Sequence, residues 1–394
     1  MWALLSLAVG SFGIGMTEFV VMGLLPDIAA DLLPEVWAAN PEQAIAQAGW
    51  LISLYALGVV IGAPTIAGSV ARFPRHRVMI VLALALAIFN ALTFILPTFE
   101  LVAASRLLAG LPHGAYFGIG ALVAADVMGP GNRAKGVAFV LTGLTLANVV
   151  GVPLGTYLGQ QVGWRSAFMV VAAIFAAATV LIGLFVPAHP GEPGRTFLQE
   201  LGVFKSGQVW LALAVGSIGF GGFFAVYSYV APVVTEVTGS AEWVVPIVLV
   251  LMGIGMTIGN LVGGHLADVS LRRTLIGGFI ALIVVLALLA LTAQWLWAFG
   301  FFVFATGFVA AGLSPTIQTR LMDVAGDNQS IAAALNHSAL NIGNSMGALL
   351  GGAVIALGWG YVAPAWVGVM LAVGGLAVAM LSLASDRRVQ PVTA

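Results

Sequence analysis

The stretch MTEFVVMGLLP, residues Met16–Pro26, places a carboxylate inside an apolar segment. The segment begins near Ala3, is long enough to cross a bilayer, and lies in a region with no Lys or Arg before Arg72. A charge at the centre of a membrane helix costs about 2.5–3.5 kcal/mol on insertion scales, so Glu18 is expected to face a cavity, a partner or a substrate. Its short side chain, and Pro26 roughly 12 Å further along a helix, disfavour the alternative that Glu18 reaches the outer interface.

The composition is that of a helical integral membrane protein. Of the 394 residues 61% are apolar and only 7% are charged, whereas soluble domains carry about 25% charged residues. The alternating pattern of a membrane β-barrel is absent from the sequence. The first segment lacks a basic start and a cleavage site, which predicts a retained helix rather than a signal peptide. With no cysteine, the chain has no disulfide, thiol chemistry or Cys-ligated zinc.

Apolar runs divide the chain into twelve predicted membrane helices. They are expected at 3–25, 48–70, 78–97, 99–126, 135–160, 165–187, 209–231, 244–267, 274–293, 296–322, 331–357 and 361–384. The longest polar connection is Ala188–Gln208, which contains Pro, Gly and mixed charges. The sequence therefore predicts an all-α fold of two six-helix bundles, over 1–187 and 209–394, joined by a linker over 188–208.

Basic residues predict the orientation of these helices. Only Arg165 falls on one side of the predicted membrane, whose loop from Asp27 to Gln47 has four acids and no Lys or Arg. The loops and ends of the other side carry Arg72, Arg75, Arg77, Arg133, Lys135, Arg195, Lys205, Arg272, Arg273, Arg387 and Arg388. Because basic loops stay in the cytoplasm, both termini and the linker are predicted to be cytoplasmic.

The two halves repeat each other. LAVGSFGIG at 7–15 matches LAVGSIGFG at 213–221. Later matches pair Gly58 and Gly62 with Gly255 and Gly259, and Asn148, Gly151 and Gly155 with Asn344, Gly347 and Gly351. The offset between matching residues falls after the first match, because the loop after the first helix is longer than the loop after the seventh. Parallel repeats with a site between them are an architecture of transporters.

Four stretches resemble the major facilitator superfamily, within it the twelve-helix drug:proton antiporters, and particularly the sugar- and arabinose-efflux and chloramphenicol-exporter subgroup. They are Thr17–Leu32, Arg106–Gly120, Gly143–Phe168 and Gly264–Arg273. The resemblance covers nearly the whole chain. It implies a bacterial inner-membrane protein that exports small molecules by alternating access, exchanges them for protons, works as a monomer in the bilayer, and needs no cofactor or nucleic acid.

The same resemblance points to a cytoplasmic gate. Its Gly-x-x-x-Asp pattern with following basic residues is intact in the second half as Gly264, Asp268, Arg272 and Arg273. Asp268 is expected to hold one of these arginines, or to cap a neighbouring helix, in an outward-open state. In the first half Ala67, Ala71 and Pro74 replace family positions, while Arg72, Arg75 and Arg77 remain; Asp126 could hold these arginines instead. The alternative is that these residues only set topology.

Glu18, Arg106 and His113 are the candidates for proton coupling. Arg106 lies roughly 10 Å into its helix, at nearly the depth of Glu18 from the same face, so the two can interact directly or through water or substrate. His113 follows two turns later and could relay protons near neutrality. Arg106 could instead hold helices together, and His113 could be structural.

The candidate substrate-binding residues are polar stripes and aromatic side chains. His337, Asn341 and Asn344 share one face of the eleventh helix, and Thr145 and Asn148 occupy the matching positions of the last two in the fifth. The full set is Met22, Tyr116, Phe117, Asn148, Phe220, Phe224, Tyr227, His337, Asn341 and Asn344. Such polar groups can also serve only as contacts between helices, and the rings as ordinary packing.

The leading hypothesis is therefore a proton-coupled efflux antiporter of small amphipathic molecules or sugars. Its rival is a proton-coupled symporter or facilitator that imports a sugar or nucleoside. An enzyme is disfavoured because the sequence has no HExxH motif, no paired catalytic carboxylates, no phosphate-binding loop and no nucleophile motif.

Overall fold

The computed structural model describes residues 1–70, 72–129, 132–188, 206–325 and 329–386, which form helices and no strands. In this part of the chain the long helices are α1 (Trp2–Gly23), α5 (Trp50–Val70), α6 (Arg75–Ile95), α7 (Phe99–Met128), α8 (Arg133–Leu146), α9 (Val152–Val162), α10 (Arg165–Phe185), α12 (Gly207–Tyr227), α14 (Val244–Thr292), α15 (Leu296–Ala325), α16 (Gln329–Ala356) and α17 (Ala363–Asp386).

Twelve membrane crossings follow from these helices. Eleven helical segments in the described residues are long and apolar enough to cross a membrane. One of them, α14, has 49 residues, or about 74 Å of helix, more than twice a hydrocarbon core. Its backbone leaves the helical conformation at Ser270, with φ −164° and ψ 96°, which divides it into two crossings. The predicted fold class of twelve spans is thus confirmed.

Shorter helices lie in the connections. They are α2 (Leu25–Leu32), α3 (Pro34–Ala39), α4 (Pro41–Ala48) and α13 (Val230–Pro232), the last followed by the π-helical turn η3 (Val233–Val237). A second π-helical turn, η1 (Ala147–Gly151), lies within the span that α8 and α9 form together. The region 27–47, expected only as a loop, forms α2, α3 and α4. Each of these three helices has a proline in its first turn. The N–H groups there have no partner within the helix, so the missing N–H of proline costs no hydrogen bond.

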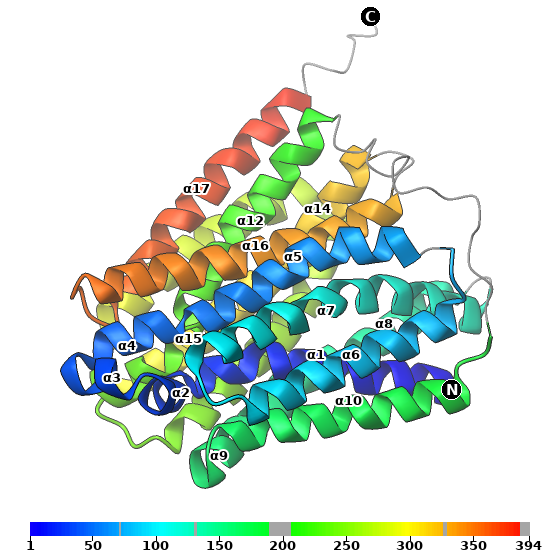
Figure 1. Cartoon of the computed structure of the whole chain (residues 1–394). Coiled ribbons are helices and arrows are strands. Elements are labelled where there is room, and N and C mark those ends of the chain that lie inside the picture. Colours follow the sequence, from blue (N-terminus) through cyan, green and yellow to red (C-terminus); the bar gives the residue numbers. More distant parts are fainter. Residues whose placement is uncertain (71, 130–131, 189–205, 326–328, 387–394) are drawn as a thin grey trace, which may run out of the picture.

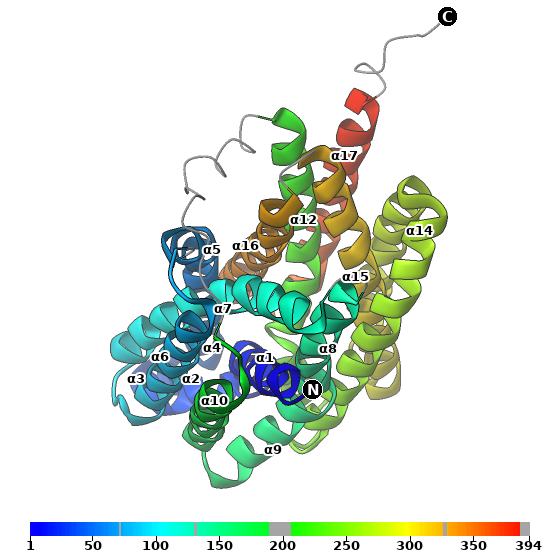
Figure 2. The same cartoon turned by 90° about the vertical axis from the view of Figure 1, so that its right-hand side faces the viewer.

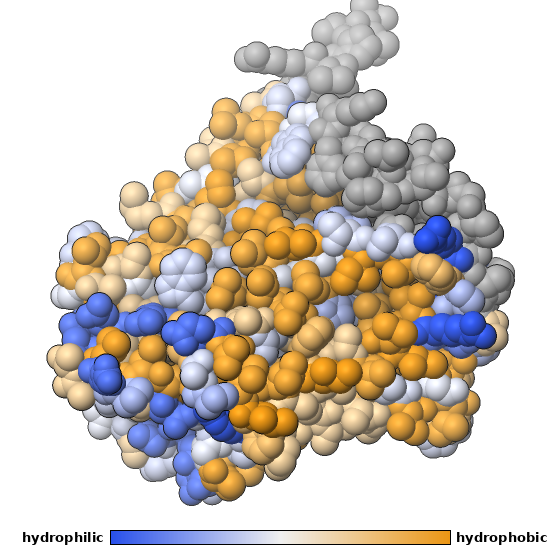
Figure 3. Space-filling view, in the orientation of Figure 1, coloured by the Kyte–Doolittle hydropathy of each residue, from blue (hydrophilic) through white to orange (hydrophobic). Residues whose placement is uncertain are grey.

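The two ends of the molecule differ in charge. We call the end with α2, α3 and α4, and with the acids Asp27, Asp31 and Glu42, the acidic face; the end with the loop at 72–74 and the start of α8 is the basic face. The N-terminus lies at the basic face (Figure 1). Figure 3 shows hydrophilic residues at both ends with a hydrophobic zone between them, as a bilayer requires.

Glycines bring spans into backbone contact in the same way in both halves. A Cβ on Gly58 or Gly62 of α5 would overlap the backbone of α7, and a Cβ on Gly255 or Gly259 of α14 would overlap the backbone of α15. These four positions are partners in the sequence repeat. Small residues permit such close approach of helices where lipid offers no hydrophobic drive to packing.

The expected domain limits stay a prediction. Helix α10 ends at Phe185 and α12 begins at Gly207, close to the limits proposed for the two bundles. Most of the 188–208 linker falls outside the described residues. So do five positions used above: Ala71, Arg195, Lys205, Arg387 and Arg388.

Candidate functional site: a central cavity

A cavity of about 760 Å³ lies between the two halves, within the range of small-molecule sites. Its lining includes Glu18 at mid-depth and extends to Phe73 and Arg75 at the basic face. Helices α7, α8, α12, α14, α15 and α16 surround the centre when the molecule is viewed along its length (Figure 2). The cavity therefore extends from the middle of the protein toward the basic face.

Contacts between the halves close the opposite side. Ser53 Oγ donates to the Ser345 carbonyl at 3.2 Å, and Gln160 Nε2 donates to the Glu242 carbonyl at 3.0 Å. A Cβ on Gly253 of α14 would overlap the carbonyl oxygen of Asn148, so the backbones of α14 and η1 also touch. The structure is a conformation closed toward the acidic face.

Glu18 lies on α1 at the inner end of the cavity. Its side chain is only 6% exposed, and its Oε1 accepts a hydrogen bond of 3.2 Å from Nδ2 of Asn344 on α16. Asn344 is the repeat partner of Asn148. The bond joins one half to the other at the level where the cavity ends.

Arg106 contacts the residue beside Glu18 rather than Glu18 itself. It is 0% exposed, and it donates through Nη1 to Thr17 Oγ1 at 2.8 Å and through Nη2 to the Thr17 carbonyl at 2.7 Å. Its guanidinium lies 4.2 Å from the ring centroid of Tyr55 and 5.3 Å from that of Phe168. No side-chain nitrogen of Arg106 lies within 4.0 Å of a carboxylate oxygen of Glu18.

Arg106 therefore holds the backbone of α1 in place next to the carboxylate. Thr17 and Tyr55 were not among the predicted site residues. The position of Thr17 beside Glu18 could have indicated from the sequence that it belongs to the site. Tyr55 is an aromatic residue in an apolar run, and nothing in the sequence marks it as a site residue.

His113 belongs to a row of rings that crosses the cavity. Its Nδ1 is 3.0 Å from Tyr55 Oη, and its ring packs edge-on against Phe117 at 5.4 Å between centroids. Phe117 in turn stacks on His337 of the other half, with centroids 5.1 Å apart and planes 5° apart. The row joins α7 to α16 between Glu18 and the basic face.

Asn148 and Asn341 line the cavity from opposite halves. Asn148 lies in η1, where Pro153 follows shortly. A proline clashes with the carbonyl four residues earlier, and the wider π turn relieves that clash. The π turn thus fixes how the Asn148 side chain is presented.

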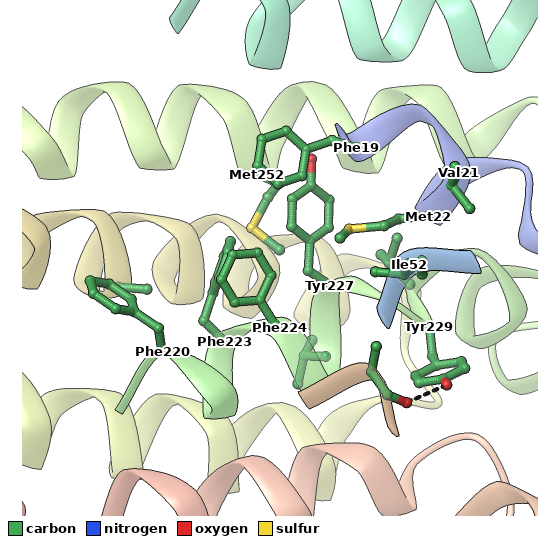
Figure 4. Packing of buried hydrophobic residues seen from close by; sticks show 14 of the residues in the cluster. Phe19, Val21, Met22, Ile52, Phe220, Phe223, Phe224, Tyr227, Tyr229 and Met252 are labelled. Atoms are coloured by element: carbon green, nitrogen blue, oxygen red, sulfur yellow. Dashed lines mark hydrogen bonds between the residues drawn. The ribbon is translucent and has the colours of Figure 1, made fainter. Parts of the chain in front are cut away.

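Aromatic side chains form the wall contributed by α12. Phe220, Phe223 and Phe224 line the cavity, and Phe224 stacks on Phe19 at 6.5 Å between centroids. Phe19 also stacks on Tyr227 at 5.4 Å, as Figure 4 shows.

Four predicted binding residues, Met22, Tyr116, Tyr227 and Asn344, lie in packed regions outside the cavity lining. Met22 is fully buried in the core. Tyr116 donates its hydroxyl to the Leu7 carbonyl at 3.1 Å, which ties α7 to α1. Tyr227 is 0% exposed and packs behind Phe19. In this conformation they support the lining rather than form it.

Two of the candidate gate residues pair with each other within the first half. Arg75 pairs with Asp126, linking α6 to α7. Asp268, Arg272 and Arg273 are exposed, and no ion pair joins them in the described part of the chain. Arg72 lies over the ring of its neighbour Phe73, 5.0 Å from the centroid. The Asp268 prediction concerned a state open to the other side, so it remains a prediction.

Known proteins share this architecture. Residues 7–268 and 235–393 match the Major Facilitator Superfamily. The chain is 37% identical over 393 residues to the inner membrane transport protein YdhP of Escherichia coli (strain K12), covering 100% of this chain and 97% of that protein. It is 30% identical over 377 residues to the chloramphenicol resistance protein of Streptomyces lividans, covering 95% of this chain and 94% of the relative.

A solved structure agrees at the level of the fold. A bacterial homologue of the human lysosomal transporter Spinster, in an inward-facing and unoccupied conformation, aligns with a TM-score of 0.72 at 16% identity, covering 100% of this chain and 98% of that one. Twelve spans around a central cavity define a multi-pass membrane transporter. The chain belongs to the major facilitator superfamily, as the sequence motifs predicted.

Proposed function

We propose that this protein is a proton-driven antiporter that exports small amphipathic molecules or sugars across the bacterial inner membrane. It acts as a monomer, with its basic face and both termini in the cytoplasm and its two bundles over 1–187 and 209–394. The observation that carries the proposal is Glu18: among the described residues that line the cavity, it is the only carboxylate. A membrane-embedded acid at a transport site is a candidate proton carrier.

Coupling requires that the proton interacts differently with the two conformations, since equal binding shifts no equilibrium. The bond between Asn344 and Glu18 supports such a difference, because it exists only while the halves meet at this level. When the acidic side opens, α1 and α16 separate and Glu18 loses that donor. Its affinity for a proton then changes with the direction in which the cavity opens.

Arg106 is proposed to position Glu18 in this cycle. Its two hydrogen bonds to Thr17 fix α1 one residue before the carboxylate. The Arg106 charge also acts on Glu18 through space. His113, which lies along the same wall, is proposed as a secondary proton site. The gate residues at the basic face close the cavity toward the cytoplasm in the alternate state.

The relatives support export as the direction of transport. One relative is named for chloramphenicol resistance, which export of the drug would produce. Within the stretch Gly143–Phe168, the residues Gly143, Gly151, Pro153 and Gly155 resemble an antiporter signature, which supports the same direction.

The test is uptake into proteoliposomes that contain the purified chain, with chloramphenicol, ethidium and arabinose as labelled probes. An antiporter accumulates its substrate when the vesicle interior is acidic, and a protonophore abolishes the accumulation. Glu18→Gln should abolish this gradient-driven uptake while exchange of a neutral substrate partly survives. Glu100→Gln, an exposed acid in the first turn of α7, is the matched control and should behave like the unmutated chain.

The rival importer gives the opposite sign. A proton symporter accumulates substrate when the vesicle exterior is acidic, so reversing the gradient separates the two functions. Full pH-driven uptake by Glu18→Gln would contradict Glu18 as the coupling site and would direct attention to His113.

A further inference from the structure

Two buried amides face the cavity in the same chemical orientation. Asn148 and Asn341 are 4% and 3% exposed, and both line the cavity. Asn148 Nδ2 donates to the Leu144 carbonyl at 3.1 Å, and Asn341 Nδ2 donates to the His337 carbonyl at 3.0 Å. In each case the amide nitrogen binds the carbonyl four residues earlier on its own helix.

This backbone contact determines which end of the amide faces the cavity. A backbone carbonyl only accepts hydrogen bonds, so the group next to it must be the NH₂ and the remaining group must be Oδ1. Neither Oδ1 has a hydrogen-bond partner among the described residues. Each half thus contributes a buried acceptor without a donor to the lining, and on α16 the Asn336 Oδ1 and Ser338 Oγ atoms of the lining are likewise without a partner in the described part of the chain. A buried acceptor without a donor costs free energy unless a donor arrives.

We propose that these two oxygens bind hydroxyl groups of a neutral, polyhydroxylated substrate, one from each half of the protein. This inference rests on the proposed transport function and selects one substrate class within it. The acceptors come from η1 and α16, on opposite halves. A single ammonium group carries its donors on one atom, whereas hydroxyls spread over a ring offer donors in several directions and so suit acceptors on separate walls.

The rest of the lining fits a neutral ligand with an apolar face. Among the described lining residues the only Lys or Arg is Arg75, and it pairs with Asp126. The lining therefore offers an anionic ligand no Lys or Arg that is outside an ion pair. Phe117, Phe220 and Phe224 supply flat apolar surfaces. A ring with hydroxyls at its edge and an apolar face or aromatic substituent satisfies both kinds of wall.

Binding would also link the halves. A ligand that donates to Asn148 and to Asn341 at once contacts both halves, so its affinity depends on how far apart they stand. Substrate binding then favours one conformation over the other, as alternating access requires.

The experiment measures binding to the full chain in lipid nanodiscs by calorimetry. The probes are phenyl β-D-glucopyranoside and chloramphenicol, each beside the derivative whose hydroxyls are all O-methylated, together with tetraphenylphosphonium, a cation without donors. O-methylation keeps the oxygens and removes the hydroxyl donors, while the amide N–H of chloramphenicol remains in both forms. We expect at least one hydroxylated probe to bind and its methylated partner to bind at least tenfold more weakly.

Substitutions locate the effect. Asn148→Ala and Asn341→Ala should each weaken binding of the hydroxylated probe roughly tenfold, and together roughly a hundredfold, since the residues lie on separate walls. Thr179→Ala is the control: it removes a side chain that bonds its own helix on α10, away from the cavity, and should leave the affinity unchanged.

Several outcomes would overturn the proposal. Equal binding of free and methylated probes, binding of tetraphenylphosphonium alone, or no binding of either hydroxylated probe each contradict a donor-recognising site. If tetraphenylphosphonium is instead carried in a proton-dependent manner, the transport function stands and this substrate class falls. If the hydroxylated probe binds through both asparagines but no pH gradient moves it, the substrate site stands and proton-driven transport falls.

Discussion

Replacing Asn344 with alanine is expected to loosen the closure at the acidic face. The Asn344 Nδ2–Glu18 Oε1 bond of 3.2 Å joins α16 to α1 and is buried. When Glu18 is ionised, this bond should contribute about 1.5–3 kcal/mol, the range for a hydrogen bond to a charged group, and each 1.4 kcal/mol is a factor of ten. Asn344→Ala should therefore shift the ratio of conformations by about 10- to 150-fold toward the one open at the acidic face.

The absence of cysteine makes this shift measurable. Ala39→Cys on α3 and Ala241→Cys before α14 are exposed positions of the acidic face, one in each half, and can carry spin labels on an otherwise unchanged chain. Electron–electron double resonance then reports the populations of short and long distances across that face. Asn341→Ala is the matched control, because the Asn341 amide nitrogen bonds its own helix.

The charge on Glu18 should determine the size of the shift. In a Glu18→Gln background the bond joins neutral groups and contributes about 0.5–1.5 kcal/mol, so Asn344→Ala should change the populations only about two- to thirteenfold. If Asn344→Ala leaves the distance distribution of the unmutated chain unchanged, the bond does not stabilise the closed side. An equal effect in both backgrounds would show that the Glu18 charge plays no part.

Gly259→Ala should lower the yield of folded protein and its melting temperature, because the added methyl group would overlap the backbone of α15; Gly264→Ala, which meets nothing within 4 Å, should not, and fluorescence-detected size-exclusion chromatography compares the two. Burial, together with the nearby charge of Glu242, raises the pKa of Asp27 on the acidic face to about 6. The folded state therefore holds this proton more tightly than the unfolded chain does, so stability should fall as pH rises from about 4 to 6, and Asp27→Asn should remove that part of the melting profile. Arg106→Lys keeps the charge but not the paired hydrogen bonds to α1, and it should reduce gradient-driven uptake at least tenfold in proteoliposomes without loss of folded protein.

The location of Glu18 at the cavity could be predicted because the cost of a charge in lipid leaves few alternatives. The number of spans and the paired glycines could be predicted equally well from the sequence. Both follow from patterns that lie within single helices and recur in the second half. The shared depth of Arg106 and Glu18 was a sound guide to proximity. It could not reveal that the guanidinium would bind the neighbouring threonine, because depth along a helix does not specify which way the side chain turns.

Other features depend on contacts between distant segments. The partner of Glu18 is Asn344, more than 300 positions away, and the stack of Phe117 on His337 also joins the two halves. No periodicity within one helix encodes such pairs. The π turn at Asn148 could not be predicted from Pro153 alone, because a proline also permits an ordinary kink.

The glycine contacts between α5 and α7, and between α14 and α15, have a consequence for how the protein sits in different membranes. Two spans whose backbones touch cannot change their tilt independently. When the bilayer becomes thicker or thinner, each pair must tilt as one unit or the surrounding acyl chains must stretch or compress around it. The balance between the two conformations should therefore respond to the chain length of the lipids, with the elastic work borne mostly by the lipid rather than by the interior of either half.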